Sequence, residues 1–262
     1  MSRIIAIANQ KGGVGKTTTN VNLSACLAAL GKKVLTIDID PQGNTTSGLG
    51  IDKNRIEKSI YDVIINSTPA KDAIIHTNFD NLDIIVSKIE LAGAEIEMVP
   101  MIARETILKR ALDEIRDEYD YILIDCPPSL GLITVNSLTA ADKLLVPIQC
   151  EYYALEGLTQ LMSTYELVRK NLNPKLEIEG VVLTMFDSRT NLGIQVVEEV
   201  KKHFRNKVYT TIIPRNVRLG EAPSHGLPVI YYDPKCAGAE AYMDLAREMI
   251  DNELEDDDGW LL

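Results

Sequence analysis

Residues 4–20 read IIAIANQKGGVGKTTTN, and this stretch decides the fold. Its apolar, β-branched start predicts a buried strand, the glycines predict a tight turn, and a helical pattern begins near Thr17. A strand, a glycine-rich turn and a helix N-terminus together form an anion site, because backbone N–H groups and the helix dipole face the ligand. We therefore expect this loop to cradle phosphates, with Lys16 reaching the β- and γ-phosphates and the Thr17 hydroxyl binding Mg²⁺.

The loop departs from the usual pattern G-x-x-x-x-G-K-[ST], because Gln10 stands where the first glycine belongs and a second lysine, Lys11, lies inside it. A glycine-rich turn with solvated lysines is the simpler alternative, but dense glycines directly before Lys-Thr-Thr argue against it. The sequence KGGVGKTT resembles the deviant Walker A loop of the ParA/MinD superfamily of ATPases. The resemblance implies that Lys11 reaches across a dimer interface to the partner's nucleotide, and hence a homodimer with two ATP molecules between its subunits.

A second apolar run at residues 33–39 leads into the sequence DIDPQGN at residues 38–44. Carboxylates at the carboxyl ends of parallel strands lie over the crevice where α/β folds bind ligands. One residue separates Asp38 from Asp40 at this strand end, and we expect the two acids to have different roles. The motif resembles D-x-D-P-Q-G-N of the same superfamily, which implies that Asp40 positions or activates the attacking water. Asp38 then supports the Mg²⁺ shell or the loop; simple turn chemistry explains Pro41 but not an acid facing a phosphate loop.

Residues 119–125, YDYILID, form an apolar run that ends in one acid. This is the form of a Walker B strand, whose aspartate binds Mg²⁺, usually through water. An isolated aspartate at a strand end is common, and only the phosphate loop makes Asp125 a strong candidate. The expected metal-binding residues are Thr17, Asp125 through water, and Asp38.

The resemblance also assigns the nucleotide and the catalytic residues. A Pro-x-Asn loop after the last strand holds the adenine in this superfamily, which assigns that role to Pro214 and Asn216; an exposed Pro-Arg loop is the alternative. The complete nucleotide-binding set is Lys11, Gly12, Gly13, Val14, Gly15, Lys16, Thr17, Thr18, Pro214 and Asn216. The expected catalytic residues are Lys11, Lys16 and Asp40, and the expected cofactors are ATP or ADP and Mg²⁺.

The order of elements predicts an α/β fold with one doubly wound, mostly parallel sheet and helices on both faces, because the strand, helix and strand over residues 4–39 imply a right-handed parallel crossover. Further strands are predicted at residues 82–86, 119–125, 143–148, 180–185 and 208–213. Helices are predicted at residues 17–30, 59–65, 91–99, 102–118, about 158–171, 195–204 and 237–253. Residues 1–252 are expected to form one phosphate-loop ATPase domain, and the acidic tail at residues 253–262 is expected to be disordered.

Composition narrows the class of protein. The chain has 262 residues and four widely spaced cysteines, which predict reduced thiols in a cytoplasm rather than a disulfide framework. No apolar run reaches the roughly 18 residues of a membrane span, and the N-terminus lacks a secretory signal pattern. An electron-transfer relative like the nitrogenase iron protein would need cysteines placed to bridge a cluster between subunits, and none is so placed. A dethiobiotin-synthetase-like enzyme is a further alternative, which only the predicted fold supports, because the sequence shows no substrate site for it.

Charge is unevenly spread over this acidic chain, whose formal net charge is −11. Residues 169–218 hold ten Lys and Arg against five Asp and Glu, a net +5, which leaves −16 for the remainder. Such asymmetry allows a local basic surface on an acidic protein, although from charge alone an ordinary solvated face is the simpler interpretation. The DNA-binding candidates are Arg189, Lys201, Lys202, Arg218 and Lys235.

Four more stretches narrow the resemblance to the ParA/Soj branch: IDCPPS at residues 124–129, CEYYALEG at 150–157, TNLGIQV at 190–196 and PRNVRLGEAPSHG at 214–226. The branch implies a slow, partner-stimulated ATPase that dimerises on ATP, binds double-stranded DNA without sequence preference and segregates chromosomes or plasmids with a ParB-type protein. It also implies a cytoplasmic, nucleoid-associated protein. The alternative is a MinD-type membrane-positioning ATPase, which ends in a basic amphipathic helix; the acidic tail here would be repelled by anionic lipid, so we expect no stable membrane association.

Overall fold

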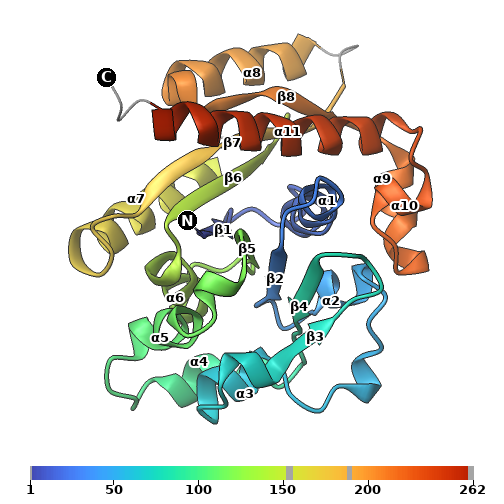
Figure 1. Ribbon diagram of the computed structural model, residues 1–262. Helices are drawn as coiled ribbons and strands as arrows, with labels where there is room; N and C mark the ends of the chain where they lie inside the picture. Colours follow the sequence, from blue (N-terminus) through green and yellow to red (C-terminus); the bar gives the residue numbers. More distant parts are fainter. Residues whose placement is uncertain (1, 152–155, 188–190, 259–262) are drawn as a thin grey trace.

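The structure, a computed structural model, describes residues 2–151, 156–187 and 191–258. Within these residues eight strands form one sheet in the order β3-β4-β2-β5-β1-β6-β7-β8, and only β3 runs antiparallel to its neighbour (Figure 1). The strands are β1 (Arg3–Ile7), β2 (Val34–Asp38), β3 (Ile74–His76), β4 (Leu82–Ile85), β5 (Tyr121–Asp125), β6 (Lys143–Gln149), β7 (Glu177–Phe186) and β8 (Val208–Pro214). The expected α/β class with a mostly parallel sheet is confirmed.

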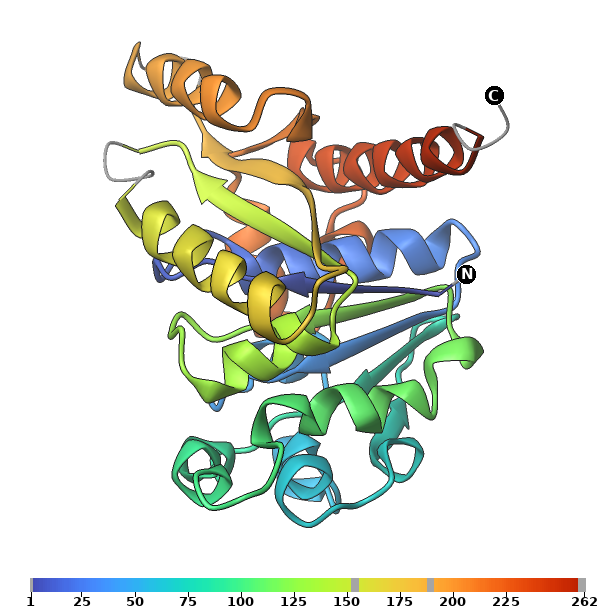
Figure 2. The same cartoon turned by 90° about the vertical axis from the view of Figure 1, so that its left-hand side faces the viewer.

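Helices connect the strands and cover both faces of the sheet. They are α1 (Lys16–Ala29), α2 (Asn44–Gly48), α3 (Ile60–Ile65), α4 (Leu91–Met98), α5 (Ile107–Asp113), α6 (Leu132–Ala140), α7 (Glu156–Asn171), α8 (Asn191–Phe204), α9 (Val217–Glu221), α10 (Val229–Tyr232) and α11 (Ala237–Asp258). Side chains of β1 show the division: Ile4 and Ala6 pack in the core shared with α3 to α8. Ile5 and Ile7 pack in the core shared with α1, α10 and α11. Because β1 is buried on both faces, its sequence is a continuous apolar run. Figure 2 shows the face of the sheet that α6 and α7 cover.

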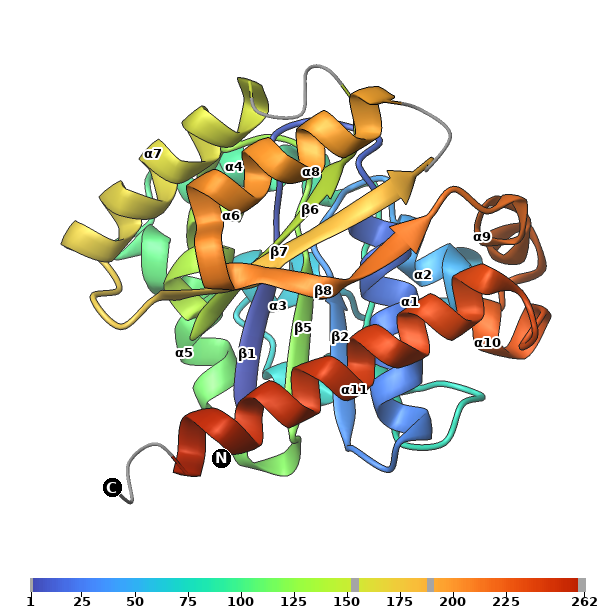
Figure 3. The same ribbon diagram turned by 90° about the horizontal axis from the view of Figure 1, so that it is seen from above.

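The register of the central strands brings the two predicted acids to the phosphate loop. Asp38 at the end of β2 pairs with Asp125 at the end of β5. Asp125 in turn pairs with Ile7, the last residue of β1. The carboxyl ends of these three strands therefore meet at one edge of the sheet, at the top of Figure 3, where α/β folds bind their ligands.

The helix predicted at residues 102–118 is shorter than expected, because α5 covers only Ile107–Asp113. Asn136, a buried side chain of α6, accepts a hydrogen bond from the Leu108 amide at 3.2 Å and donates one to the Arg104 carbonyl at 2.8 Å. These bonds satisfy one backbone group in the first turn of α5 and one in the segment before it. Ala103, with a φ of 53°, also breaks the helical path. A tertiary contact thus overrides the local helical pattern.

The C-terminal helix is longer than expected, and this corrects the tail prediction in part. Helix α11 continues from Ala237 to Asp258, so residues 253–258 are helical rather than disordered. Glu253 anchors this part of the helix, because it pairs with Arg3 at 3.0 Å and accepts a short hydrogen bond from Tyr121. Residues 259–262 lie outside the described residues. None of the described helices is long and apolar enough to span a membrane.

Candidate nucleotide-binding site

The loop between β1 and α1 has the backbone of a phosphate cradle. Gly13 and Gly15 take φ angles of 73° and 90°, which glycine adopts readily because it has no Cβ. Thr184 at the end of β7 donates a hydrogen bond to the Val14 carbonyl at 2.8 Å and so fixes the loop from the neighbouring strand. This contact holds the loop in a conformation in which the N-terminus of α1 is available to bind an anion.

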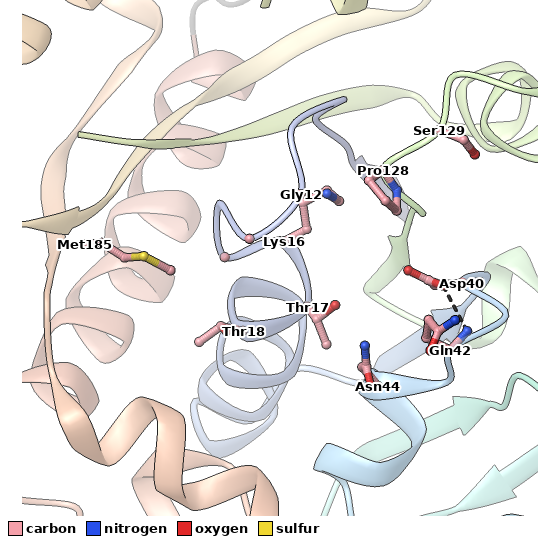
Figure 4. Close-up of a pocket in the computed structure, with 12 residues that line it drawn as sticks. Gly12, Lys16, Thr17, Thr18, Asp40, Gln42, Asn44, Pro128, Ser129 and Met185 are labelled. Atoms are coloured by element: carbon pink, nitrogen blue, oxygen red, sulfur yellow. Dashed lines mark hydrogen bonds between the residues drawn. The ribbon is translucent and has the colours of Figure 1, made fainter. Parts of the chain in front are cut away.

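A pocket of about 580 Å³ lies in front of this loop (Figure 4). Its walls come from the loop, from the loop after β2, from the turn after β5 and from the end of β7. The lining residues are Gly12, Gly13, Gly15, Lys16, Thr17, Thr18, Asp40, Gln42, Asn44, Pro128, Ser129 and Met185. Seven residues predicted from the sequence therefore share this pocket, whereas Lys11 and Val14 do not line it.

The two lysines of the loop are placed differently. Lys16 is only 7% exposed, and its Nζ donates to the Lys11 carbonyl at 3.1 Å. Burial lowers the pKa of Lys16, while the carboxylates of Asp125 and Asp40 oppose the shift. Without nucleotide, the ammonium group of Lys16 is therefore hydrogen-bonded to a neutral backbone carbonyl, and a phosphate oxygen of a bound nucleotide would replace this acceptor. Because the Lys11 side chain does not line the pocket of its own chain, its role across an interface stays a prediction.

Asp125 has the surroundings of a metal-binding acid. It is fully buried, and Thr45 donates to its Oδ2 at 2.8 Å, while its Oδ1 has no hydrogen-bond partner among the described residues. Burial raises the pKa of Asp125, the neighbouring Asp38 raises it further, and the hydroxyls of Thr17 and Thr45 oppose the shift. A buried, unpaired carboxylate oxygen near a threonine hydroxyl fits the oxygen-ligand chemistry of Mg²⁺. The geometry supports the expected pairing of Thr17 with Asp125.

Asp38 and Asp40 do have different surroundings, but not because of strand alternation: residues two apart on a strand share a face, and the two acids differ because β2 ends at Asp38 and Asp40 lies in the loop after it. Asp38 is fully buried and does not line the pocket; its Oδ2 accepts from the amide and the hydroxyl of Thr46 at 2.8 and 2.7 Å. Burial raises its pKa. Asp40 lines the pocket, and its Oδ1 accepts from the Gln42 amide at 2.9 Å (Figure 4). Of the two roles expected for Asp38, these contacts support the loop rather than the metal.

A smaller pocket of about 240 Å³ adjoins the loop on its other side. Pro214 and Asn216 both line it, together with Gly15 and Thr18. The side-chain oxygen of Asn216 caps α9 by accepting from the Arg218 amide at 2.8 Å. A contact from this side chain to a base would therefore come most directly from its amide nitrogen. The position of both residues supports the predicted adenine site.

The DNA-binding candidates do not gather in one place. Lys201 and Lys202 are exposed in the last turn of α8, and Arg218 is exposed on α9. Figures 1 and 3 show that these two helices lie apart in the fold. Lys235, which precedes α11, is also exposed. Lys202 pairs with Glu199, and Arg218 pairs with both Glu221 and Asp233, so these two cations are already partly neutralised. Arg189 lies outside the described residues.

Sequence reasoning missed five residues of the larger pocket: Gln42, Asn44, Pro128, Ser129 and Met185. A usable signal existed for four of them. Gln42 and Asn44 belong to the DIDPQGN motif, and Pro128 and Ser129 follow Asp125 closely. Because ligands of α/β folds bind at the carboxyl ends of the strands, all four residues could have been predicted to line the pocket. Met185 has a φ of 52°, and no local pattern predicts its place.

Fold and site together define a phosphate-loop nucleotide-binding protein with a second lysine in its loop. A family model described as AAA domain matches residues 2–178. The chain is 64% identical to the sporulation initiation inhibitor protein Soj of Bacillus subtilis over 96% of this chain and 100% of that one. It is 55% identical to the chromosome partitioning protein ParA of Caulobacter vibrioides over 96% and 95%. The chain belongs to the ParA/Soj family of chromosome-partitioning ATPases.

A solved structure supports the same fold and the expected cofactors. It is described as cobyrinic acid a,c-diamide synthase from Mycobacterium smegmatis with bound ADP and magnesium. The likeness has a TM-score of 0.83 at 37% identity and covers 94% of this chain and 93% of that one. The cofactors of the site are ATP or ADP and Mg²⁺, as the sequence predicts.

Proposed function

We propose that this chain hydrolyses ATP, dimerises when ATP is bound, and binds double-stranded DNA without sequence preference to segregate chromosomes or plasmids with a ParB-type partner. The observation that carries the proposal is the pair of lysines on one loop. Lys16 is buried at the pocket, and Lys11 does not line the pocket of its own chain. The sequence identity to chromosome-partitioning relatives supports the biological setting. The proposed location is cytoplasmic, on the nucleoid.

The residues of the pocket have separate roles in this proposal. Lys16 and the loop amides bind the phosphates, and the Thr17 hydroxyl with Asp125, through water, holds the metal. The metal held there would supply positive charge that offsets the charge developing on the transferred phosphoryl group. Asp40, held by the Gln42 amide, orients the attacking water. Pro214 and Asn216 hold the adenine.

Hydrolysis by the isolated protein is expected to be slow. Arg215 lines the smaller pocket, but it pairs with Glu151 at 3.2 Å. We therefore assign no arginine finger to it, and a finger supplied by a partner is the usual route to faster phosphoryl transfer. Stimulation by a ParB-type protein would then release the dimer from DNA.

Two weak phosphate-binding surfaces bind far more tightly once they are joined rigidly, because the second contact becomes intramolecular. The cations on α8 and the one on α9 lie apart in one subunit, so in this proposal the dimer brings the surfaces of two subunits onto one duplex. Contacts to phosphates carry no sequence information and weaken with salt. DNA binding should therefore require ATP and fall as salt is raised.

The test is sedimentation of Asp40→Ala protein on random-sequence duplex DNA with ATP and with ADP, at two salt concentrations. Binding only with ATP, at the mass of a dimer and weakened by salt, is the expected result. Absence of binding in both nucleotide states would refute DNA binding, and wild-type ATP hydrolysis by Asp40→Ala would refute the role of Asp40. Flotation with anionic vesicles and ATP tests the MinD-type alternative in the same preparation.

A further inference from the structure

Beneath the nucleotide pocket lies a buried network of polar side chains. Its members come from α1, β2, α2, β5 and the segment after β4, and all are fully excluded from solvent. They are Asn20, Thr36, Asp38, Thr45, Thr46, Ser87 and Asp125. Buried polar groups are costly unless they are hydrogen-bonded, so a network of this size at a site has a specific structural role.

Two adjacent threonines of α2 reach two different strand ends. Thr45 donates to Oδ2 of Asp125 at 2.8 Å, and Thr46 donates to Oδ2 of Asp38 at 2.7 Å. Helix α2 directly follows the loop that carries Asp40. The threonines therefore attach this loop separately to β5 and to β2.

The donor direction at Thr45 follows from the chemistry of its partners. An ionised carboxylate only accepts, so the Thr45 hydroxyl has to donate to Asp125. The Asn20 amide nitrogen then donates to the same hydroxyl at 3.1 Å and to Thr36 at 2.6 Å. The hydroxyl of Thr45 is thus held from behind by α1 while it holds one oxygen of Asp125. The other oxygen, Oδ1, stays buried and without a hydrogen-bond partner in the described part of the chain.

We infer that Thr45 is a positioning residue for the metal site: its hydroxyl fixes the Asp125 carboxylate, leaves Oδ1 for the hydration shell of Mg²⁺, and ties the metal-binding acid to the loop that carries Asp40. The inference rests on the proposed role of Asp125 in binding Mg²⁺ through water. Residues that orient metal ligands in this way change metal affinity by about 10- to 100-fold when they are removed.

The test is the Mg²⁺ dependence of nucleotide binding, which needs no turnover. A fluorescent ADP analogue is titrated into wild-type protein and into Thr45→Val in EDTA and at increasing MgCl₂. In EDTA the two proteins should bind alike, because the phosphate loop is unchanged. The Mg²⁺ concentration at half-maximal effect should rise by about tenfold in Thr45→Val and return to the wild-type value in Thr45→Ser.

Thr46→Val is the matched control, because it removes the same group one residue away but breaks the bonds to Asp38 and from the Ser87 amide, and leaves the bond to Asp125 in place. Its Mg²⁺ dependence should stay close to that of the wild type. Equal rises in both valine variants would show that a loosened α2 causes the effect, and an unchanged Thr45→Val would show that the hydroxyl is not needed; either result overturns the inference. If Thr45→Val does not fold, Thr45→Ala is measured against the same two criteria.

Asp125→Ala separates this inference from the assignment on which it rests. If its Mg²⁺ dependence equals that of the wild type, Asp125 does not serve the metal and the proposed site is wrong. If Asp125→Ala loses the dependence while Thr45→Val keeps it, the site stands and the inference about Thr45 fails.

Discussion

Removal of the last ten residues should destabilise the protein, because the structure anchors the chain at Glu253. The change is truncation after Asn252, at the boundary that the sequence predicts for the domain. It removes the ion pair of Glu253 with Arg3, at 3.0 Å, in which the two side chains are only 18% and 14% exposed. It also removes the acceptor for the hydroxyl of Tyr121, a residue that is 1% exposed.

The magnitude follows from these two contacts. A hydrogen bond to a charged group contributes about 1.5–3 kcal/mol, and the partly exposed ion pair adds less than that. Water reaches part of the space that Glu253 leaves, so we expect a total loss of about 2 kcal/mol. For a domain of this size each kcal/mol shifts Tm by about 2–4 °C, so the truncated protein should melt about 4–8 °C lower.

The assay is thermal unfolding followed by circular dichroism without nucleotide, because bound ligand would raise Tm by mass action. Truncation after Asp258 is the matched control and should leave Tm unchanged. Glu253→Gln keeps a hydrogen-bond acceptor but loses the charge, so it should show an intermediate loss. The reasoning is refuted if truncation after Asn252 melts together with the full chain.

Three further predictions concern the site. Lys16→Ala should lose nucleotide affinity by more than tenfold in a binding titration, because its ammonium binds the phosphates; retained affinity would contradict its place in the pocket. Lys11→Ala should keep ADP binding by the monomer but lose the ATP-dependent dimer in analytical ultracentrifugation, and a dimer of normal affinity would argue against its role across the interface. Burial raises the pKa of Asp38 in the folded state, so the stability that its protonated form contributes is present below the unfolded pKa of about 4 and is lost as the pH rises toward neutrality. Between pH 4 and neutrality, the free energy of unfolding, measured by urea denaturation of nucleotide-free protein, should therefore fall less for Asp38→Asn than for the wild type. An equal fall in both proteins would show that the pKa of Asp38 is not raised in the folded state.

Several features of this protein follow from local sequence. The strand-loop-helix at residues 4–20 predicts the phosphate site, because glycine conformations, the helix N-terminus and Lys16 are all within a few residues of one another. The two acids Asp38 and Asp40 follow from the local motif DIDPQGN, whereas their different surroundings arise because β2 ends at Asp38 and Asp40 lies in the loop beyond it. The class of fold follows from the repeated order of strands and helices.

Other features depended on contacts between distant segments. No element is predicted over residues 132–140, where α6 lies and packs in the core shared with α5 and α7. The contacts that hold α11 at Glu253 come from Arg3 and Tyr121, which are distant in the sequence. Helices α8 and α9, which carry the candidates Lys201, Lys202 and Arg218 of one basic window, lie apart in the fold (Figures 1 and 3).

The sequence by itself therefore predicted the phosphate loop and the acids at the strand ends, since these depend on spacings of a few residues, and the resemblance to the ParA/MinD superfamily predicted the nucleotide. Only the tertiary structure decided which groups meet beneath the pocket. Thr45 and Asp125 are 80 positions apart, and their hydrogen bond forms because the sheet places β2 beside β5 in a fixed register. Local propensity carries no information about such a pairing, because the chain topology and the packing of both helical layers set it.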